Sequence, residues 1–139
     1  RVVVAGAGDV GCETALHLAE AKGKKVTLVE MRERILMDCR EPVSATSLNI
    51  RLPQAGVDIR TGVTLRSVED GLVRCMNGDG ESVEIEADSV ILATGTRPNA
   101  DIAAEFEGLA PQVFKIGDCV KPRKIYDAFH EAWDVVFSF

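Results

Sequence analysis

The apolar positions at the start of the chain follow the pattern of a strand–helix–strand unit. Residues 2–5 (VVVA) form a continuous apolar run, which is typical of a strand buried on both faces of a parallel sheet. Apolar residues then recur at helical spacing to about residue 22, and Gly23 favours a helix end there. Residues 26–30 predict a second strand. The unit is therefore a βαβ motif, for which a right-handed crossover is expected.

The pattern changes in the middle of the chain. Residues 41–54 predict a short helix, and residues 57–60 predict a third strand. Three more strands are predicted over residues 63–68, 72–76 and 82–86, and the turn sequences EDG and NGDG separate them. These segments predict an antiparallel β-meander at a place where a repeated βαβ fold would have another helix.

One more buried strand is predicted over residues 89–93, and a loop with the sequence TGTRPNA follows it. We therefore predict an α/β fold: a three-layer Rossmann-like domain with a parallel sheet of order 3-2-1-4, in which residues 2–5 are central. The antiparallel three-stranded meander forms the crossover, and we expect it to pack over one face of the sheet.

The C-terminal region predicts a short strand over residues 113–116 and a helix over residues 124–139. We expect this strand to join the sheet beside residues 89–93. Four apolar residues of the helix recur at i, i+4, i+8 and i+11, so they share one face, which is expected to cover apolar surface. They are Ile125, Phe129, Trp133 and Val136.

Composition narrows the class of protein. The chain has 139 residues, about the size of one domain, and its 46% hydrophobic content is sufficient for a buried core. The formal net charge of −6 argues against nucleic-acid binding, and no apolar run reaches the roughly 18 residues that a membrane helix needs. The chain begins with Arg1, directly before a strand and without a methionine, so we interpret it as a piece of a longer protein.

The cysteines and histidines predict no metal site. Cys12, Cys39, Cys75 and Cys119 include no CxxC pair and match no zinc spacing. We therefore expect reduced cysteines and a cytoplasmic protein. Both histidines lie on predicted helices, and we interpret them as structural or surface groups.

The turn between the first strand and the first helix has the pattern G-x-G-x-x-G. Its members are Gly6, Ala7, Gly8, Asp9, Val10 and Gly11. Gly6 permits the tight turn, Gly8 lets a pyrophosphate approach the backbone, and Gly11 lets the helix pack on the strand. The helix N-terminus would supply N–H groups and a partial positive charge. Asp9 should not help phosphate binding, and it fits a helix cap or a dipole partner. The alternative is a glycine turn that binds nothing.

An acidic residue stands where a dinucleotide-binding fold needs one. Glu30 closes the second strand, 19 residues after Gly11, and could accept hydrogen bonds from the hydroxyls of the adenosine ribose. A carboxylate here favours NAD(H) over NADP(H), because it repels a 2′-phosphate. Met31 and Arg32 follow directly, and we expect them to contact the nucleotide. Arg32 or Arg34 could pair with a 2′-phosphate, which leaves NADP(H) as the second choice.

Three features together resemble a known family: the stretch VVVAGAGDVGCETALHLAEAKGKKVTLVE, the meander followed by VILATGTRPN, and the segment KIGDCVKPRKIYDAFHEAW. Over its whole length the chain resembles the pyridine-nucleotide half of a flavoprotein with two dinucleotide-binding domains. It is most similar to the C-terminal region of the NADH:flavin oxidoreductases related to 2,4-dienoyl-CoA reductase and trimethylamine dehydrogenase. The combination is much more specific than the glycine pattern alone.

The resemblance implies further site residues. Thr94 and Gly95 would shape a turn near the dinucleotide, and Asp118 in IGDC would contact the ribityl or phosphate region of a flavin. Glu13 matches a glutamate that helps to place the nicotinamide beside the flavin, although a first-turn helix acid is an equally good interpretation. No residue is expected to act as a catalytic nucleophile or an essential base.

The resemblance also implies an organisation and a set of cofactors. Residues 1–112 would form the NAD(P)-binding domain, and residues 113–139 would be a strand–helix segment resembling the end of an FAD-binding domain. The parent protein would bind FAD, and a missing N-terminal barrel would carry FMN and a 4Fe-4S cluster. The partners would be the FAD domain and the barrel of the same chain, with no nucleic acid and no membrane, and the parent could form a homo-oligomer.

The predicted function is to bind NADH and present its nicotinamide for hydride transfer to FAD. The resemblance suggests an enoate or dienoyl-CoA reductase, or an NADH oxidase, as the parent. A non-catalytic NAD-sensing regulatory module is the alternative, since such modules share the glycine pattern and the acid. The meander and the IGDC segment argue against it. A methyltransferase is a third option, disfavoured because residues 2–5 carry no acid.

Overall fold

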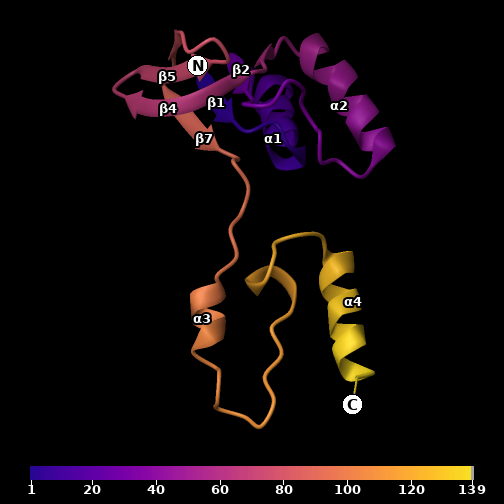
Figure 1. Ribbon diagram of the computed structural model, residues 1–139. Coiled ribbons are helices and arrows are strands. Elements are labelled where there is room, and N and C mark those ends of the chain that lie inside the picture. The colour runs from indigo at the N-terminus through magenta and orange to yellow at the C-terminus, as the bar shows by residue number, and fades with distance from the viewer. Residues whose placement is uncertain (139) are drawn as a thin grey trace. The chain divides into compact units, whose positions relative to one another are not determined.

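The computed structural model describes residues 1–138, which form two compact units: Arg1–Gly95 (unit 1), and a second unit that starts at Thr96 (unit 2) (Figure 1). Unit 1 contains β1 (Val2–Ala5), α1 (Asp9–Glu20), β2 (Val26–Val29), α2 (Pro42–Gln54), β3 (Asp58–Arg60), β4 (Val63–Glu69), β5 (Leu72–Asn77), β6 (Ser82–Glu86) and β7 (Ser89–Leu92). Unit 2 contains α3 (Ala100–Ala104), a 3-10 turn (Gly117–Cys119) and α4 (Ile125–Val136). Within residues 1–138, no helix has the length and apolarity needed to cross a bilayer.

The main sheet of unit 1 is parallel and has the order β3-β2-β1-β7. In β1, Val2 lies beside Val26 of β2 on one side and beside Ser89 of β7 on the other. Both edges of β1 are therefore paired, and both of its faces are covered, since Val3 and Val4 on opposite faces are 1% and 0% exposed. The predicted order 3-2-1-4, with the first strand central, is therefore confirmed.

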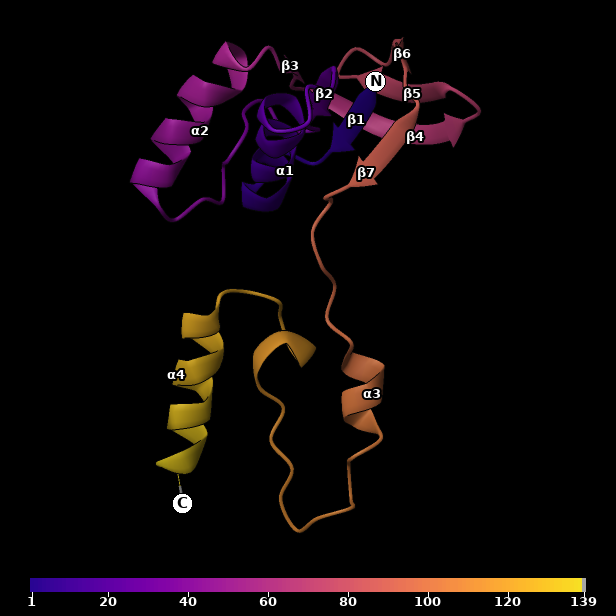
Figure 2. The ribbon, with the colours of Figure 1, turned by 180° about the vertical axis from the view of Figure 1, so that it is seen from behind.

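The sheet has a different layer on each face. Strands β4, β5 and β6 form the predicted antiparallel meander, and Val73 and Ile85 pack in one cluster with Val3 of β1. Helices α1 and α2 cover the opposite face, where Leu16 and Leu52 pack with Val4. Figures 1 and 2 show the helices on one side of the sheet and the meander on the other. The three-layer Rossmann-like α/β fold is thus confirmed.

The C-terminal strand prediction is wrong. Residues 113–116 form no strand, and β7 pairs with β1 alone among the described strands. A strand needs a neighbour that satisfies its backbone N–H and C=O groups, and the described part of unit 2 contains no other strand to supply one. The predicted C-terminal helix is present as α4, but it ends at Val136, and residue 139 of the predicted range lies outside the described residues. The apolar face of α4 is not covered: Ile125 is 91% exposed and Trp133 is 55% exposed.

The elements of unit 1 meet at two glycines. Gly6, with a φ of +101°, follows β1, and a Cβ on this residue would lie 2.3 Å from the carbonyl oxygen of Ala93. A Cβ on Gly11 would lie 1.8 Å from the carbonyl oxygen of Gly6. These are backbone contacts, so rotation of a side chain cannot relieve them. Only glycine lets α1 approach β1, and β1 approach the end of β7, this closely.

The first prediction concerns this packing. Replacing Gly11 with alanine should lower the free energy of unfolding by about 1–3 kcal/mol or more, because the added methyl group must displace backbone. Gly78→Ala is the matched control, since nothing lies within 4 Å of its Cβ position and its backbone is compatible with alanine. Urea unfolding followed by circular dichroism should give a lower midpoint for Gly11→Ala alone. Equal midpoints for the two variants would contradict the packing argument.

Candidate functional site

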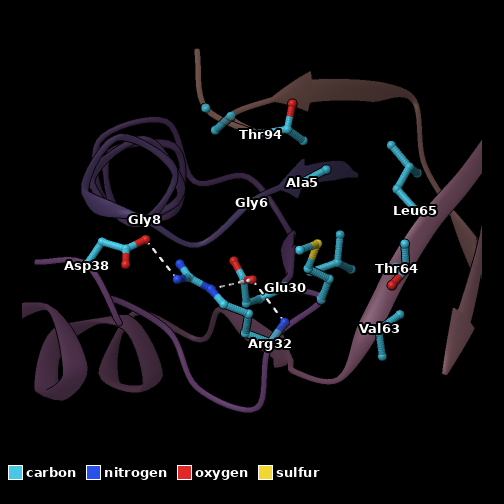
Figure 3. Close-up of a pocket in the computed structure, with 14 residues that line it drawn as sticks. Ala5, Gly6, Gly8, Glu30, Arg32, Asp38, Val63, Thr64, Leu65 and Thr94 are labelled. Carbon is cyan, nitrogen blue, oxygen red and sulfur yellow. Dashed lines mark hydrogen bonds and ion pairs between the residues drawn. The ribbon is translucent and has the colours of Figure 1, made fainter. Parts of the chain in front are cut away.

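A cavity of about 460 Å³ lies at the carboxyl ends of β1, β2 and β7 (Figure 3). In open α/β sheets this edge is where ligands bind, because the loops that leave the strands converge there. The start of β4 forms another wall, so the meander contributes to the site as well as to the core. The lining residues are Ala5, Gly6, Gly8, Val29, Glu30, Met31, Arg32, Asp38, Val63, Thr64, Leu65, Ala93, Thr94 and Gly95.

The glycine loop presents the N-terminus of α1 to this edge. Gly8 is the N-cap residue of α1, so no side chain at this position hydrogen-bonds to the first N–H groups of the helix. No atom lies within 4 Å of the position that a Cβ on Gly8 would take, so the space above this backbone is open. A 12-residue helix carries unsatisfied N–H groups and a partial positive charge at this end. The loop therefore fits an anionic group such as a pyrophosphate.

The buried side chain of Glu30 holds the glycine loop through hydrogen bonds to backbone N–H groups. The residue is 5% exposed. Its Oε2 accepts a hydrogen bond from the Ala7 N–H at 2.7 Å, and its Oε1 accepts one from the Arg32 N–H at 3.0 Å. The Arg32 Nε donates a longer bond to Oε1 at 3.4 Å. A carboxylate has about four acceptor positions, so one remains for a ligand hydroxyl. Glu30 thus holds the loop and still fits a ribose acceptor.

The segment that follows β2 also makes a backbone hydrogen bond to the glycine loop. The Leu36 N–H donates to the Ala7 carbonyl oxygen at 2.8 Å, and the Cys12 thiol lies 3.4 Å from the same oxygen. Leu36 is buried and has a φ of 58°, a left-handed conformation that is uncommon for a residue other than glycine. The backbone of Ala7 is therefore fixed at its N–H by Glu30 and at its C=O by Leu36.

Arg32 lies between two carboxylates (Figure 3). Its Nη1 donates to Asp38 Oδ2 at 2.8 Å, while its Nε faces Glu30. The hydrogen bond to Asp38 is the main reason that the pKa of Arg32 is raised above its ordinary value. Arg34, the other arginine considered for a 2′-phosphate, is exposed and lines a separate hollow with Glu33.

Seven of the predicted site residues line the cavity. They are Gly6, Gly8, Glu30, Met31, Arg32, Thr94 and Gly95. The other members of the loop do not line the cavity. Gly11 packs on Gly6, and Ala7 donates a hydrogen bond to Glu30. Asp9 and Val10 are the first two residues of α1. Glu13 is exposed on α1 and is not part of the lining.

Sequence reasoning missed Asp38 and the wall formed by β4, namely Val63, Thr64 and Leu65. The only sequence signal for Asp38 is an acid six residues after Arg32 in a segment without periodicity. The alternation of apolar residues predicts the strands of the meander, but it does not predict which loop they pack against. The position of β4 beside the cavity therefore could not be read from the sequence.

Asp118 lies in unit 2, in a turn that α4 holds. Glu131 of α4 accepts a hydrogen bond from the Gly117 N–H at 2.6 Å and pairs with the Arg123 guanidinium. That guanidinium, followed by the Gly117 N–H, lowers the pKa of Glu131. Asp118 is exposed and accepts a longer bond from the Arg123 N–H at 3.4 Å. The turn thus presents one exposed carboxylate, and the sequence around it lacks a glycine-rich loop like that of unit 1.

None of the four cysteines, all of which lie within the described residues, forms a disulfide. Burial is the main cause that raises the pKa of Cys12 to about 12, and the nearby Asp9 carboxylate raises it further. Burial also raises the pKa of Cys75. A buried thiol with a raised pKa has little access to reagents and a reduced share of thiolate, so neither residue is suited to nucleophilic or redox chemistry.

Comparison with known proteins matches this chain to oxidoreductases. The sequence profile of the pyridine nucleotide-disulphide oxidoreductase family matches residues 1–134. An NADH oxidase of Thermoanaerobacter brockii is 37% identical over 140 residues, covering 97% of this chain and 21% of the relative. A cinnamate reductase of Clostridium sporogenes is 32% identical over 139 residues, covering 97% of this chain and 20% of the relative.

Among solved structures, a 2-naphthoyl-CoA reductase in complex with 2-naphthoyl-CoA superposes with a TM-score of 0.80 and 31% identity, covering 95% of this chain and 20% of that chain. The chain therefore spans about a fifth of the length of each of these three proteins.

The second prediction concerns thiol reactivity. Iodoacetamide at pH 8 should alkylate the half-buried Cys39 and Cys119 before Cys12 and Cys75, because the second pair is buried and burial raises the pKa of both of its thiols. Peptide mass spectrometry of timed samples measures the order, and in urea all four should react at similar rates. Native labelling of Cys12 as fast as that of Cys119 would show that the contacts around Ala7 are not as described.

Proposed function

Because the chain belongs to the pyridine nucleotide-disulphide oxidoreductase family, we propose that unit 1 binds NADH and presents its nicotinamide for hydride transfer to FAD. The observation that supports this most directly is one cavity that combines an open helix N-terminus at Gly8 with the acid Glu30 at the end of β2. The cofactors supply the redox chemistry, and the chain supplies binding and orientation.

Each part of the cavity has a role in this proposal. The backbone around Gly6 and Gly8 and the N-terminus of α1 hold the pyrophosphate. Glu30 accepts a hydrogen bond from a ribose hydroxyl with its remaining acceptor position. Thr94 and Gly95, which follow β7, line the same cavity and are placed by the proposal near the nicotinamide half.

The charges beside Glu30 favour NADH over NADPH. Two carboxylates, Glu30 and Asp38, face one guanidinium, so the group carries one net negative charge. A 2′-phosphate would enter this field in addition to losing its own hydration. A neutral 2′-hydroxyl is not repelled by this charge, and it can donate a hydrogen bond to Glu30.

The family and the relatives also support a proposal for the domains, reaction and cofactors of the parent protein. We infer that residues 1–112 belong to the nicotinamide-binding part and that residues 113–139 belong to an FAD-binding part, which would bring Asp118 to the flavin. The relatives named NADH oxidase and cinnamate reductase support an NADH oxidase or an enoate reductase as the parent. FMN and a 4Fe-4S cluster in an N-terminal barrel, a homo-oligomer and a cytoplasmic location are part of this proposal.

The alternative of a regulatory NAD-sensing module is disfavoured. The family profile covers residues 1–134, so it includes the meander and the IGDC segment as well as the βαβ unit. The similarity to a 2-naphthoyl-CoA reductase structure extends over 95% of the chain. Both findings fit part of a flavin-dependent oxidoreductase.

The third prediction tests the nucleotide site. Replacing Gly8 with alanine should lower the urea midpoint less than Gly11→Ala does, because the added Cβ meets no protein atom and only the weaker N-cap preference of alanine acts. The variant should nevertheless raise the Kd for NADH about tenfold or more, because the methyl group occupies the approach to the pyrophosphate. Isothermal titration calorimetry with NADH and NADPH measures both the loss and the preference.

Gly78→Ala adds the same methyl group in the turn between β5 and β6 and should bind NADH like the unmodified chain. Unchanged NADH affinity in Gly8→Ala would remove the glycine loop from the site. Tighter binding of NADPH than NADH by the unmodified chain would overturn the proposed preference.

The fourth prediction is that the 139-residue chain does not retain FAD. Asp118 offers one or two hydrogen bonds of about 1 kcal/mol each, which cannot offset the several kcal/mol lost when a large ligand is immobilised. The chain is mixed with excess FAD and desalted, and the flavin absorbance of the protein fraction is read. A stoichiometric yellow protein would mean that the glycine loop holds FAD rather than NADH.

A further inference from the structure

Arg32 is positioned where a nucleotide 2′-substituent would lie, but its charge is already engaged. In dinucleotide-binding folds the acid at the end of the second strand bonds to the 2′-hydroxyl, and a nearby arginine accommodates a 2′-phosphate. Glu30 holds that strand position, and the Arg32 Nε faces its Oε1 at 3.4 Å. By position alone, Arg32 would equip this cavity for NADPH.

Asp38 changes that expectation. Its Oδ2 lies 2.8 Å from the Arg32 Nη1, so the guanidinium spans the two carboxylates with Nε toward one and Nη1 toward the other (Figure 3). Asp38 is itself part of the cavity lining. A phosphate that approached Arg32 would therefore meet a second carboxylate beside the guanidinium, with Glu30 on its other side.

We propose that Asp38 determines the nucleotide preference of this cavity: it holds Arg32 against Glu30 and adds a second carboxylate, and so excludes the 2′-phosphate of NADPH. The inference rests on the proposed function, namely that the cavity binds a nicotinamide dinucleotide. Asp38 is a positioning residue in this account, because it acts through Arg32 and through its own charge.

Asp38 is exposed, and its effect on selectivity does not depend on how much it stabilises the fold. Its side chain is 81% exposed, so the ion pair with Arg32 contributes little to the stability of the fold. Selectivity depends on a different quantity, the charge that a phosphate meets at the cavity. Without the Asp38 carboxylate, one guanidinium would face one carboxylate, and Nη1 would be free to join Nη2 in a bidentate contact with a phosphate.

The test measures the ratio of the Kd for NADPH to the Kd for NADH by calorimetry. Asp38→Asn keeps the size of the side chain and removes its charge, and we expect the ratio to fall about tenfold, equivalent to about 1.4 kcal/mol. Asp38→Glu restores a carboxylate and should return the ratio toward that of the unmodified chain. Adding Arg32→Ala to Asp38→Asn should abolish the gain in NADPH affinity.

Asp58→Asn is the matched control. Asp58 also pairs with an arginine, Arg60, at 2.9 Å, but it opens β3 and does not line the cavity. This variant loses the same charge and should leave the ratio unchanged. An equal fall in Asp58→Asn would overturn the inference, because general surface charge would then explain the effect.

The remaining outcomes separate the two proposals. If the unmodified chain binds NADH but Asp38→Asn leaves the ratio unchanged, Asp38 does not set the preference and the proposed function stands. A fall that persists when Arg32→Ala is added would show that Asp38 does not act through Arg32. If the unmodified chain binds neither nucleotide, the proposed function fails and this inference fails with it.

Discussion

The close contact between Gly6 and Gly11 is the constraint on which the rest of unit 1 depends. A Cβ on Gly11 would come within 1.8 Å of the Gly6 carbonyl oxygen, and one on Gly6 would come within 2.3 Å of the Ala93 carbonyl oxygen. Two glycines therefore allow β1, α1 and the end of β7 to meet. The meeting point lies at the carboxyl edge of the sheet, so the packing that closes the fold also delivers a helix N-terminus to the cavity.

A buried carboxylate then fixes the loop that these glycines form. Burying the charge of Glu30 would be costly without partners, and the N–H groups of Ala7 and Arg32 provide them. The same segment after β2 carries Leu36, which bonds to the loop, and Asp38, which holds Arg32. The residues that hold the glycine loop in place are therefore sequence neighbours of residues that line the cavity.

Unit 2 has a different character. It fixes its own turn through Glu131, which binds both the Gly117 N–H and the Arg123 guanidinium, yet the apolar face of α4 is exposed at Ile125 and Trp133. An exposed apolar face of this kind is typical of a surface that packs against other protein. The chain spans about a fifth of the length of the relatives compared above, and the proposed FAD domain of the parent is a candidate to cover this face.

The sequence by itself determined the βαβ unit, the glycine loop, the acid Glu30 and the meander, because periodicity, turn residues and motif spacing act over a few neighbouring residues. Tertiary structure alone decided that Asp38 holds Arg32 and that Leu65 of β4 lines the cavity. The first depends on how a segment without periodicity folds back on itself, and the second depends on how the meander packs over the sheet. Tertiary structure also decided that residues 113–116 form no strand. Apolar periodicity can favour an extended segment, but a strand exists only where another strand accepts and donates its backbone hydrogen bonds.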